Sequence, residues 1–231
     1  MTGHLLAGPV EAEGKPLRRD AELNLARILL AARDVFAEHG YEASMEQIAA
    51  RAGVGVGTLY RRFPNKAELV SAVIEAASQR TEQIVEALLA TSSPAEGVFE
   101  FLRQCIAVPS CWRVIASRAP WTDVTTSSSL ARVAPIIDTL LDRAKAAGAI
   151  RPDVAFTDLA VVLMSVRAVA DLCDPHVPSA STRYLELVFD GLRPGGPAWV
   201  HPPMTVTELN TVLTGRPGSE ISGEEPDRGS V

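Results

Sequence analysis

The chain has 231 residues, of which 47% are hydrophobic and 22% are charged, and its formal net charge is −6 at pH 7. This length allows a sizeable hydrophobic core, and this composition excludes an intrinsically disordered chain. The acidic balance alone argues against nucleic-acid binding. The charge is unevenly placed, however, because residues 18–66 hold 8 Lys and Arg against 6 Asp and Glu, a net of +2, which leaves −8 for the remainder. A mildly basic N-terminal part on an acidic body fits a protein that meets nucleic acid at one end.

The three cysteines, Cys105, Cys111 and Cys173, are odd in number and have no CxxC spacing. They predict neither a disulfide framework nor a zinc site, and we expect buried thiols in a reducing compartment. The N-terminal residues lack the basic start and the apolar run of a signal peptide. The most apolar segment, residues 154–170, is interrupted by two charged side chains, which favours a buried helix over a membrane span. We therefore expect a cytoplasmic protein with no metal, cofactor or membrane partner.

Residues 1–19 show no sustained period and predict a flexible N-terminal arm. Apolar residues then recur at helical spacing over residues 20–39, and Gly40 is placed to end this first helix in a left-handed conformation. Ser44, with Gln47 three residues later, is a capping box that opens a second helix. A long N-terminal helix followed closely by a short capped one is the result.

The second helix ends at Gly53, where the chain needs a positive φ to turn. A third helix is expected from Val56 to Phe63, because the proline that follows blocks its extension. Asn65 then caps a fourth helix that runs to about Leu89. Two short helices joined by a tight glycine turn, residues 44–63, are typical of a helix-turn-helix.

The region from 92 to 194 shows helical spacing and no strand alternation bounded by hairpin turns. From Gly195 on, Pro, Gly, Ser and acidic residues predict a disordered tail over 195–231, apart from one short turn at 206–213. The whole chain is therefore expected to be all-α, with about nine helices. Those of the C-terminal part are placed at 93–108, 112–118, 127–148 with a cap at Ser127 to Ser129, 156–173 and 180–192.

The inner faces of the second and third helices are apolar, with Ile48, Ala49 and Ala52 on one and Val54 and Leu59 against them. The opposite face of the third helix is then exposed, and its small, hydroxyl and cationic side chains suit contact with DNA. A hydroxyl or ammonium group suits a phosphate, and a guanidinium can also pair with guanine through two parallel hydrogen bonds. The plain alternative is a set of solvated polar residues on a small helical domain. The candidate DNA contacts are Ser44, Val56, Gly57, Thr58, Tyr60, Arg61, Arg62 and Lys66.

The segment GVGVGTLYRRFPNKAELV, preceded by FAEHGYEASMEQIAARA, resembles the TetR family of bacterial transcriptional regulators. The resemblance covers residues 18–80, and GAIRPDVAFTDLA at 148–160 shows a weaker similarity to the same family. It implies a DNA-binding head over 20–80, and a helical body over 81–194 that dimerises and holds a small-molecule pocket. It carries the family's DNA contacts onto Ser44, Val56, Gly57, Thr58, Tyr60, Arg62 and Lys66.

The helix predicted over 156–173 is apolar nearly all round, so it needs cover on every side. Either it lies at the centre of one core, or it is shared between a core and a homodimer interface. The resemblance favours the dimer, and two recognition helices spaced one DNA turn apart would read a palindrome. The candidate interface residues are Leu159, Val162, Val166, Tyr184, Leu185, Val188, Phe189 and Leu192.

Arg167 stands inside this apolar helix, and a buried guanidinium needs a partner. Asp171, four residues on, is one candidate, and an acceptor on a bound ligand is another. Ligand sites are mostly apolar with few polar groups, although plain core packing is the alternative for each wall residue. The candidate pocket residues are Phe99, Cys105, Trp112, Trp121, Met164 and Arg167.

These features together predict a ligand-responsive homodimeric repressor, which binds a palindromic operator and is released by a small, largely apolar effector. An activator or a ligand-independent regulator of the same fold is the alternative. A helical enzyme or a protein-binding adaptor is more remote. The four histidines lie at termini or element ends without a paired nucleophile or metal-ligand spacing, and no glycine-rich phosphate loop follows a strand.

Overall fold

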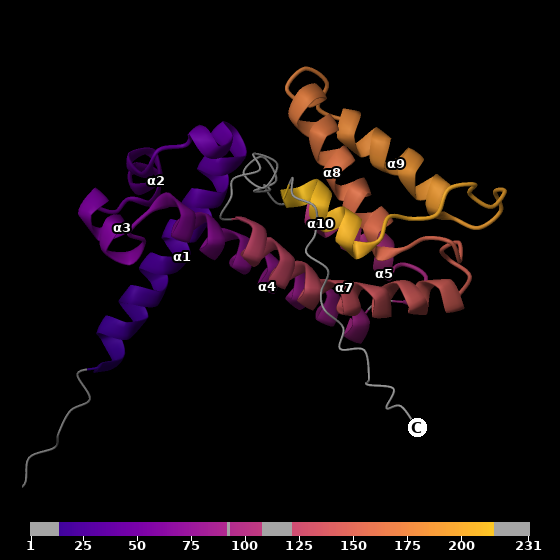
Figure 1. The fold of residues 1–231 in the computed structure, drawn as a ribbon, viewed down its shortest axis with the longest axis horizontal. Coiled ribbons are helices and arrows are strands. Elements are labelled where there is room, and N and C mark those ends of the chain that lie inside the picture. The colour runs from indigo at the N-terminus through magenta and orange to yellow at the C-terminus, as the bar shows by residue number, and fades with distance from the viewer. Residues whose placement is uncertain (1–13, 92, 108–121, 215–231) are drawn as a thin grey trace, which may run out of the picture.

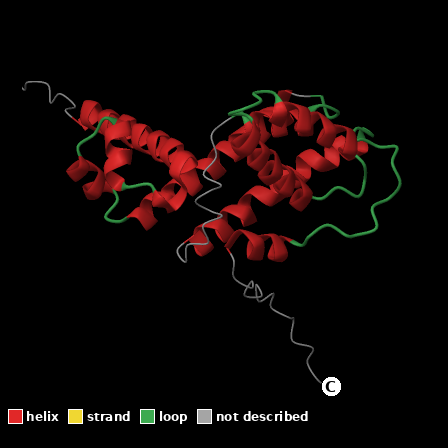
Figure 2. Cartoon of the chain, turned by 90° about the horizontal axis from the view of Figure 1, so that it is seen from above, coloured by secondary structure: helices red, strands yellow, loops and turns green. Residues whose placement is uncertain are grey.

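The computed structural model describes residues 14–91, 93–107 and 122–214, and these residues form helices and no strands (Figure 2). Nine α-helices and one 3-10 turn make up the described part of the chain. They gather around two separate hydrophobic clusters, one near each end of the molecule in Figure 1. We call the N-terminal cluster with its helices the head and the C-terminal one the body. The all-α prediction is confirmed.

Helix α1 spans Gly14–His39, so it begins six residues before the predicted start at residue 20. The expected flexible arm is therefore wrong for residues 14–19, and residues 1–13 lie outside the described part. Lys, Leu, Arg and Ala all favour helix, so a helix can extend here without the apolar period that the sequence criterion requires. The 3-10 turn Gly40–Glu42 follows, with a φ of 59° at Gly40.

Helices α2 (Met45–Ala52) and α3 (Val56–Arg62) complete the head together with the first turns of α4. Phe36, Ile48 and Leu59 are fully buried at the centre of the head. The inward-facing set that the sequence predicted on α2 and α3 is confirmed, except that Val54 is only partly buried.

Helix α4 (Lys66–Thr91) joins the two clusters as one uninterrupted helix. Its 26 residues correspond to a length of about 39 Å. Leu69 and Val73 on its N-terminal part are buried in the head, whereas Val85 and Leu88 are buried in the body. A single helix therefore contributes side chains to both cores.

The body contains α5 (Gly97–Ile106), α7 (Thr122–Ala146), α8 (Phe156–Cys173), α9 (Ala180–Leu192) and α10 (Val206–Thr214). The bounds of α8 and α9 are those the sequence predicted. Helix α5 begins at Gly97 because the preceding residues form a turn closed by Glu96 N–H donating to the Ser93 carbonyl. Helix α7 begins before the predicted Ser127 to Ser129 cap, which lies inside the helix. The short helix predicted at 112–118 lies outside the described residues.

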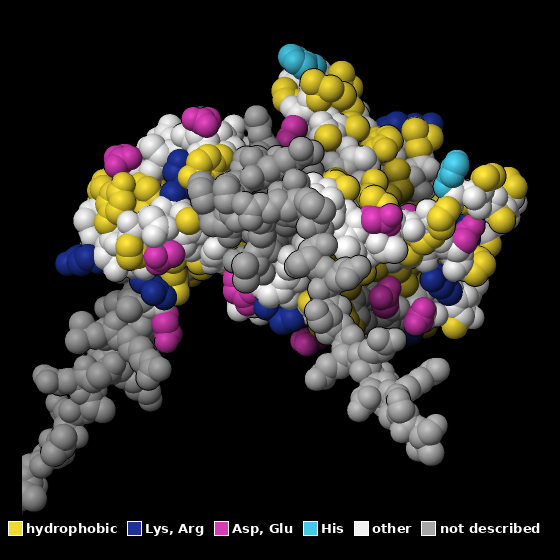
Figure 3. Space-filling view, in the orientation of Figure 1, with side chains coloured by type: hydrophobic (Ala, Val, Ile, Leu, Met, Phe, Trp, Pro, Cys, Tyr) yellow, Lys and Arg dark blue, Asp and Glu magenta, His cyan; other side chains and the backbone are white. Residues whose placement is uncertain are grey.

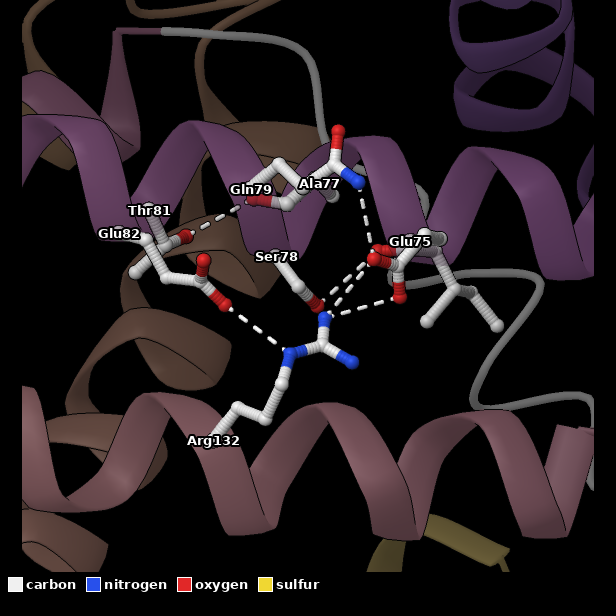
Figure 4. A network of polar contacts seen from close by, with 8 residues as sticks. Glu75, Ala77, Ser78, Gln79, Thr81, Glu82 and Arg132 are labelled. Atoms are coloured by element: carbon white, nitrogen blue, oxygen red, sulfur yellow. Dashed lines mark hydrogen bonds and ion pairs between the residues drawn. The ribbon is translucent and has the colours of Figure 1, made fainter.

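Helices α4 and α7 run side by side along the length of the body (Figure 1). Arg132 on α7 connects them, because its guanidinium donates to Glu75 at 2.9 Å and to Glu82 at 3.2 Å (Figure 4). Both acceptors lie on α4. The hydrogen bond from Arg132 holds the pKa of Glu75 below its usual value. These exposed bonds join α4 and α7 at the surface, beside the apolar packing between the two helices.

The segment after α9 is ordered up to residue 214, which contradicts the disordered tail predicted over 195–231 for its first part. Leu209 on α10 is fully buried in the body. Arg151 donates to the Pro197 carbonyl at 2.6 Å and lies 4.0 Å from the centre of the Trp199 ring. These contacts hold the segment on the body despite its content of Pro and Gly. Within the described residues, no helix is both long and apolar enough to cross a membrane.

Candidate nucleic-acid interface and body cavity

The N-terminus of α2 is held by the capping box that the sequence predicted. Ser44 Oγ accepts a hydrogen bond from Gln47 N–H at 3.1 Å, and Gln47 Oε1 accepts one from Ser44 N–H at 2.8 Å. The side chain of Ser44 therefore already has a structural partner. Contact with DNA would be an additional role.

The turn between α2 and α3 depends on Gly53, which has a φ of 66°. Arg27 on α1 donates from Nη2 to the Ala52 carbonyl at 2.9 Å. A Cβ at Gly53 would lie 2.7 Å from the same Nη2 atom. The glycine is required both by its left-handed backbone and by the approach of Arg27. Nothing in the sequence indicates this role for Arg27, because the two groups are 25 residues apart.

Helix α3 presents one buried and one exposed face. Leu59 is fully buried, while Val56, Gly57, Tyr60 and Arg62 are exposed. A Cβ at Gly57 would meet nothing within 4 Å. Packing among the described residues would therefore allow a side chain at this position. With glycine there, the backbone of α3 is open to close approach by another molecule.

The polar side chains of α3 and of the start of α4 differ in their intramolecular partners. Arg61 donates to Thr58 Oγ1 at 3.0 Å, which places both side chains together on the exposed face. Lys66 Nζ donates to the Tyr41 carbonyl at 2.8 Å and lies 4.3 Å from the centre of the Tyr41 ring. Burial, followed by the nearby charge of Glu42, raises the pKa of Tyr41. Lys66 thus helps to fix α4 on the 3-10 turn and still places a cation beside α3.

A cavity of about 500 Å³ lies between head and body. Helix α1 contributes Leu29, Leu30 and Arg33, and α4 contributes residues between Val73 and Ile84. The wall on the body side comes from α5 and α8. The remaining lining residues are Ala76, Ala77, Arg80, Thr81, Gln104, Cys105, Ile106, Leu163 and Arg167.

The predicted pocket residues are divided by the structure. Cys105 and Arg167 line the cavity. Phe99 is buried in the core of the body, where its ring meets that of Phe189 edge-on at 4.9 Å. Met164 packs against that core and does not line the cavity. Trp112 and Trp121 lie outside the described residues. The lining from α1 was not predicted, since a cavity formed by distant segments has no periodic signal.

Arg167 has a hydrogen-bond partner that was not among the two candidates from the sequence. Its Nη2 atom donates to the Ile106 carbonyl at the end of α5, at 2.9 Å. Burial lowers the pKa of Arg167, and the charge of Asp171 partly opposes this effect. Burial raises the pKa of the Cys105 thiol to about 12. Both side chains are half-buried in the wall on the body side.

Five of the eight residues predicted for a dimer interface are packed inside the body itself. Leu159, Val166, Leu185, Phe189 and Leu192 are all buried in the single chain, so they belong to its own core. In the sequence, an apolar helix face does not reveal whether it meets its own core or a partner. The other three, Val162, Tyr184 and Val188, are partly exposed.

Other apolar side chains of α8 and α9 do face outward. Val161, Leu172 and Leu187 are exposed to 37%, 75% and 55%. Hydrophobic atoms are visible over these two helices in Figure 3. Among the described residues, no group of three His, Cys, Asp or Glu side chains is placed to hold a metal ion.

A three-helix head with a capped, glycine-turned helix pair and an exposed cationic second helix defines a helix-turn-helix DNA-binding protein. Residues 28–73 match the family model described as bacterial regulatory proteins of the tetR family. Residues 93–194 match that of the C-terminal domain of SbtR-like transcriptional regulators. A TetR regulatory protein from Mycobacterium vanbaalenii is 33% identical, covering 77% of this chain and 99% of its own, with a TM-score of 0.59. The TetR regulator SCO0520 from Streptomyces coelicolor is 35% identical, covering 74% and 99%, with a TM-score of 0.56.

An HTH-type transcriptional regulator of Staphylococcus aureus is 45% identical over 60 residues, which is 26% of this chain and 32% of that protein. The chain thus spans about a third of the length of the curated relatives that it matches. The chain belongs to the TetR family of bacterial transcriptional regulators, whose members act by binding DNA and not as enzymes.

Proposed function

We propose that this chain is a ligand-responsive homodimeric repressor, in which the cavity between head and body controls the position of the DNA-reading helix α3. The observation that carries the proposal is the lining of that cavity. It includes residues of α1 from the head, residues of α8 from the body, and the middle of α4, which is continuous between both cores. A ligand held there would contact every element that sets the angle of the head.

On the DNA side, α3 would enter the major groove with Gly57 and Val56 closest to the duplex. Tyr60 and Lys66 are suited to backbone phosphates, and Arg61 or Arg62 to guanine. Arg61 bonds to Thr58 in the free protein, so reading a base would require it to exchange that partner. Most of the contacts would therefore position the protein, and few would select a sequence.

Gating would follow from the geometry of α1 and α4. A ligand in the cavity would set the distance between Leu30 on α1 and Leu163 on α8, and so tilt the head on the body. In a dimer, this tilt would change the spacing of the two α3 helices away from one DNA turn. By linkage, DNA and ligand must weaken each other by the same factor. The uninterrupted path through α4 supports this mechanism.

For the dimer, we propose the outward face of α8 and α9 in place of the buried set. Val161, Ala168 and Leu172 lie on one side of α8 at spacings of seven and four residues, and Leu187 is exposed on α9. Tyr184 and Ser165 lie beside them, joined by a hydrogen bond of 3.4 Å. Exposed apolar patches of this kind mark interaction surfaces. The same face would give two heads the two-fold symmetry that a palindromic operator requires.

The test is a footprint on the DNA upstream of the gene and its neighbours, followed by anisotropy titrations on the protected site. The proposal predicts a two-fold symmetric footprint and salt-sensitive binding. Repression predicts that a reporter placed behind this site is silenced by the protein. Activation of the reporter would favour the alternative of an activator. The proposal includes a cytoplasmic location, because bacterial DNA lies in the cytoplasm.

A further inference from the structure

The cavity between head and body is apolar but cationic. Leu29, Val73, Ile84 and Leu163 give it hydrocarbon walls from three helices. The charged side chains among its described lining residues are all arginines, with no Asp or Glu among them. A cavity of this composition is unsuited to a cationic ligand, because the arginines would repel it.

The three arginines come from three different helices, with Arg33 on α1, Arg80 on α4 and Arg167 on α8. Arg33 is partly neutralised by Asp34, with an ion pair of 2.8 Å. Arg167 donates to the Ile106 carbonyl, and the charge of Asp171 also acts on it. Within the described part of the chain, Arg80 has neither a hydrogen bond nor an ion pair. The lining therefore keeps a positive balance.

The surroundings of these charges strengthen their effect on an anion. Burial lowers the pKa of Arg167, so its charge lies where water screens poorly. The Cys105 thiol beside it stays neutral, because burial raises its pKa to about 12 although Arg80 and Arg167 both act to lower it. Asp171 is the acidic group whose charge acts on Arg167, and it is not part of the lining.

We propose that this cavity binds an anionic amphiphile, with a carboxylate held by Arg80 and Arg167 and a hydrocarbon tail held between α1, α4 and α8. Guanidinium groups pair with carboxylates through strong, charge-assisted hydrogen bonds. The volume of about 500 Å³ suits a small ligand. Because Arg33 and Leu29 belong to the head, the bound molecule bridges head and body directly. This inference rests on the proposed function, since it names the ligand class of the same cavity.

The test uses three probes that share one tail and differ in charge: octanoate, 1-octanol and octylamine. Isothermal titration calorimetry on the full chain at neutral pH gives their affinities. We expect octanoate to bind about tenfold more tightly than 1-octanol, which is the effect of a charge-assisted contact, and octylamine to bind most weakly. Equal binding of octanoate and 1-octanol, or no binding of any probe, would overturn the inference.

Matched substitutions assign the effect to the arginines. Arg80→Met and Arg167→Met remove the charge and keep an unbranched side chain, and each should weaken octanoate about tenfold with 1-octanol unchanged. Arg51→Met is the control, because Arg51 is paired with Glu38 and does not line the cavity. Circular dichroism checks that the Arg167→Met variant folds. Because Arg80 is exposed, Arg80→Met should fold normally, and it tests the inference even if Arg167→Met does not fold. Unchanged octanoate affinity in both variants would contradict the inference.

Failure of this inference and failure of the gating proposal give different results. If octanoate binds through the arginines but leaves operator affinity unchanged, the ligand class stands and gating is wrong. If another compound shifts operator affinity through the cavity while octanoate does not bind, gating stands and the ligand class is wrong.

Discussion

Arg27 on α1 donates a hydrogen bond of 2.9 Å to the carbonyl of Ala52, the last residue of α2. This bond connects the longest helix of the head to the turn that sets the direction of α3. The DNA-reading helix is thus oriented by a residue that need not contact DNA.

Arg27→Met should lower the free energy of unfolding by about 1 kcal/mol, which is the usual net contribution of one hydrogen bond. It should also weaken operator binding, because the turn between α2 and α3 loses its hydrogen bond to α1. Chemical denaturation and anisotropy titration measure the two effects. Arg51→Met, which breaks the exposed pair with Glu38, is the control and should cost less. Equal effects of the two substitutions would remove the special role of Arg27.

Gly57→Ala and Gly53→Ala should change stability in opposite directions. A Cβ at Gly57 meets nothing, and alanine in a helix is favoured over glycine by roughly 0.5–1 kcal/mol. Gly53→Ala should destabilise, since the left-handed backbone and Arg27 both oppose a side chain there. Gly57→Ala should nevertheless weaken operator binding if the backbone of α3 approaches the duplex. Unchanged operator affinity would place α3 farther from the DNA than we propose.

Tyr60→Phe should weaken binding to operator and to unrelated DNA by a similar factor, because a phosphate contact carries no sequence information. Lys66→Met should do the same and reduce the salt dependence by about one counterion per half-site. Anisotropy titrations at several salt concentrations measure both. A loss confined to the operator would instead assign base recognition to the substituted residue.

Leu172→Asp and Leu187→Asp should give monomers that remain folded, because both side chains are exposed in the single chain. Leu185→Asp is the comparison, since Leu185 is buried in the body and a carboxylate there should unfold it. Light scattering gives the mass, and circular dichroism gives the fold. A dimer that persists in both exposed variants would exclude this face of α8 and α9.

The Cys105 thiol should be unreactive at pH 8, since burial raises its pKa to about 12 and the thiolate is the reactive form. Iodoacetamide labelling followed by peptide mass spectrometry measures its rate. Because the folded state holds this proton more tightly, the associated stability is present below the ordinary thiol pKa and is lost as pH rises toward 12. Rapid labelling of Cys105 in the folded chain at pH 8 would contradict this burial.

The local rules of helix capping predicted the head well. The capping box of Ser44 and Gln47, the left-handed Gly53 and the cap at Asn65 each depend on residues within three positions of one another. Such signals can be read from the sequence because the partner is nearby in the chain. The bounds of α8 and α9 were predicted for the same reason.

What the sequence could not predict depends on distant partners. Arg33 and Leu30 line the cavity only because α1 packs on α4 and faces α5 and α8 across the cavity, and Leu209 is buried only because α10 packs on α7. The apolar faces of α8 were visible in the sequence, but which one meets the core was not. Leu159 is buried in the core and Leu172 is exposed, although both are leucines on the same helix.

The most direct test of the account is a linkage measurement on the full chain. Operator affinity is measured by anisotropy with and without saturating octanoate, and octanoate affinity is measured by calorimetry with and without operator. We predict that each ligand weakens the other by the same factor, about fivefold or more. Octanoate that fills the cavity while operator affinity stays unchanged would contradict the coupling of head and body through α4.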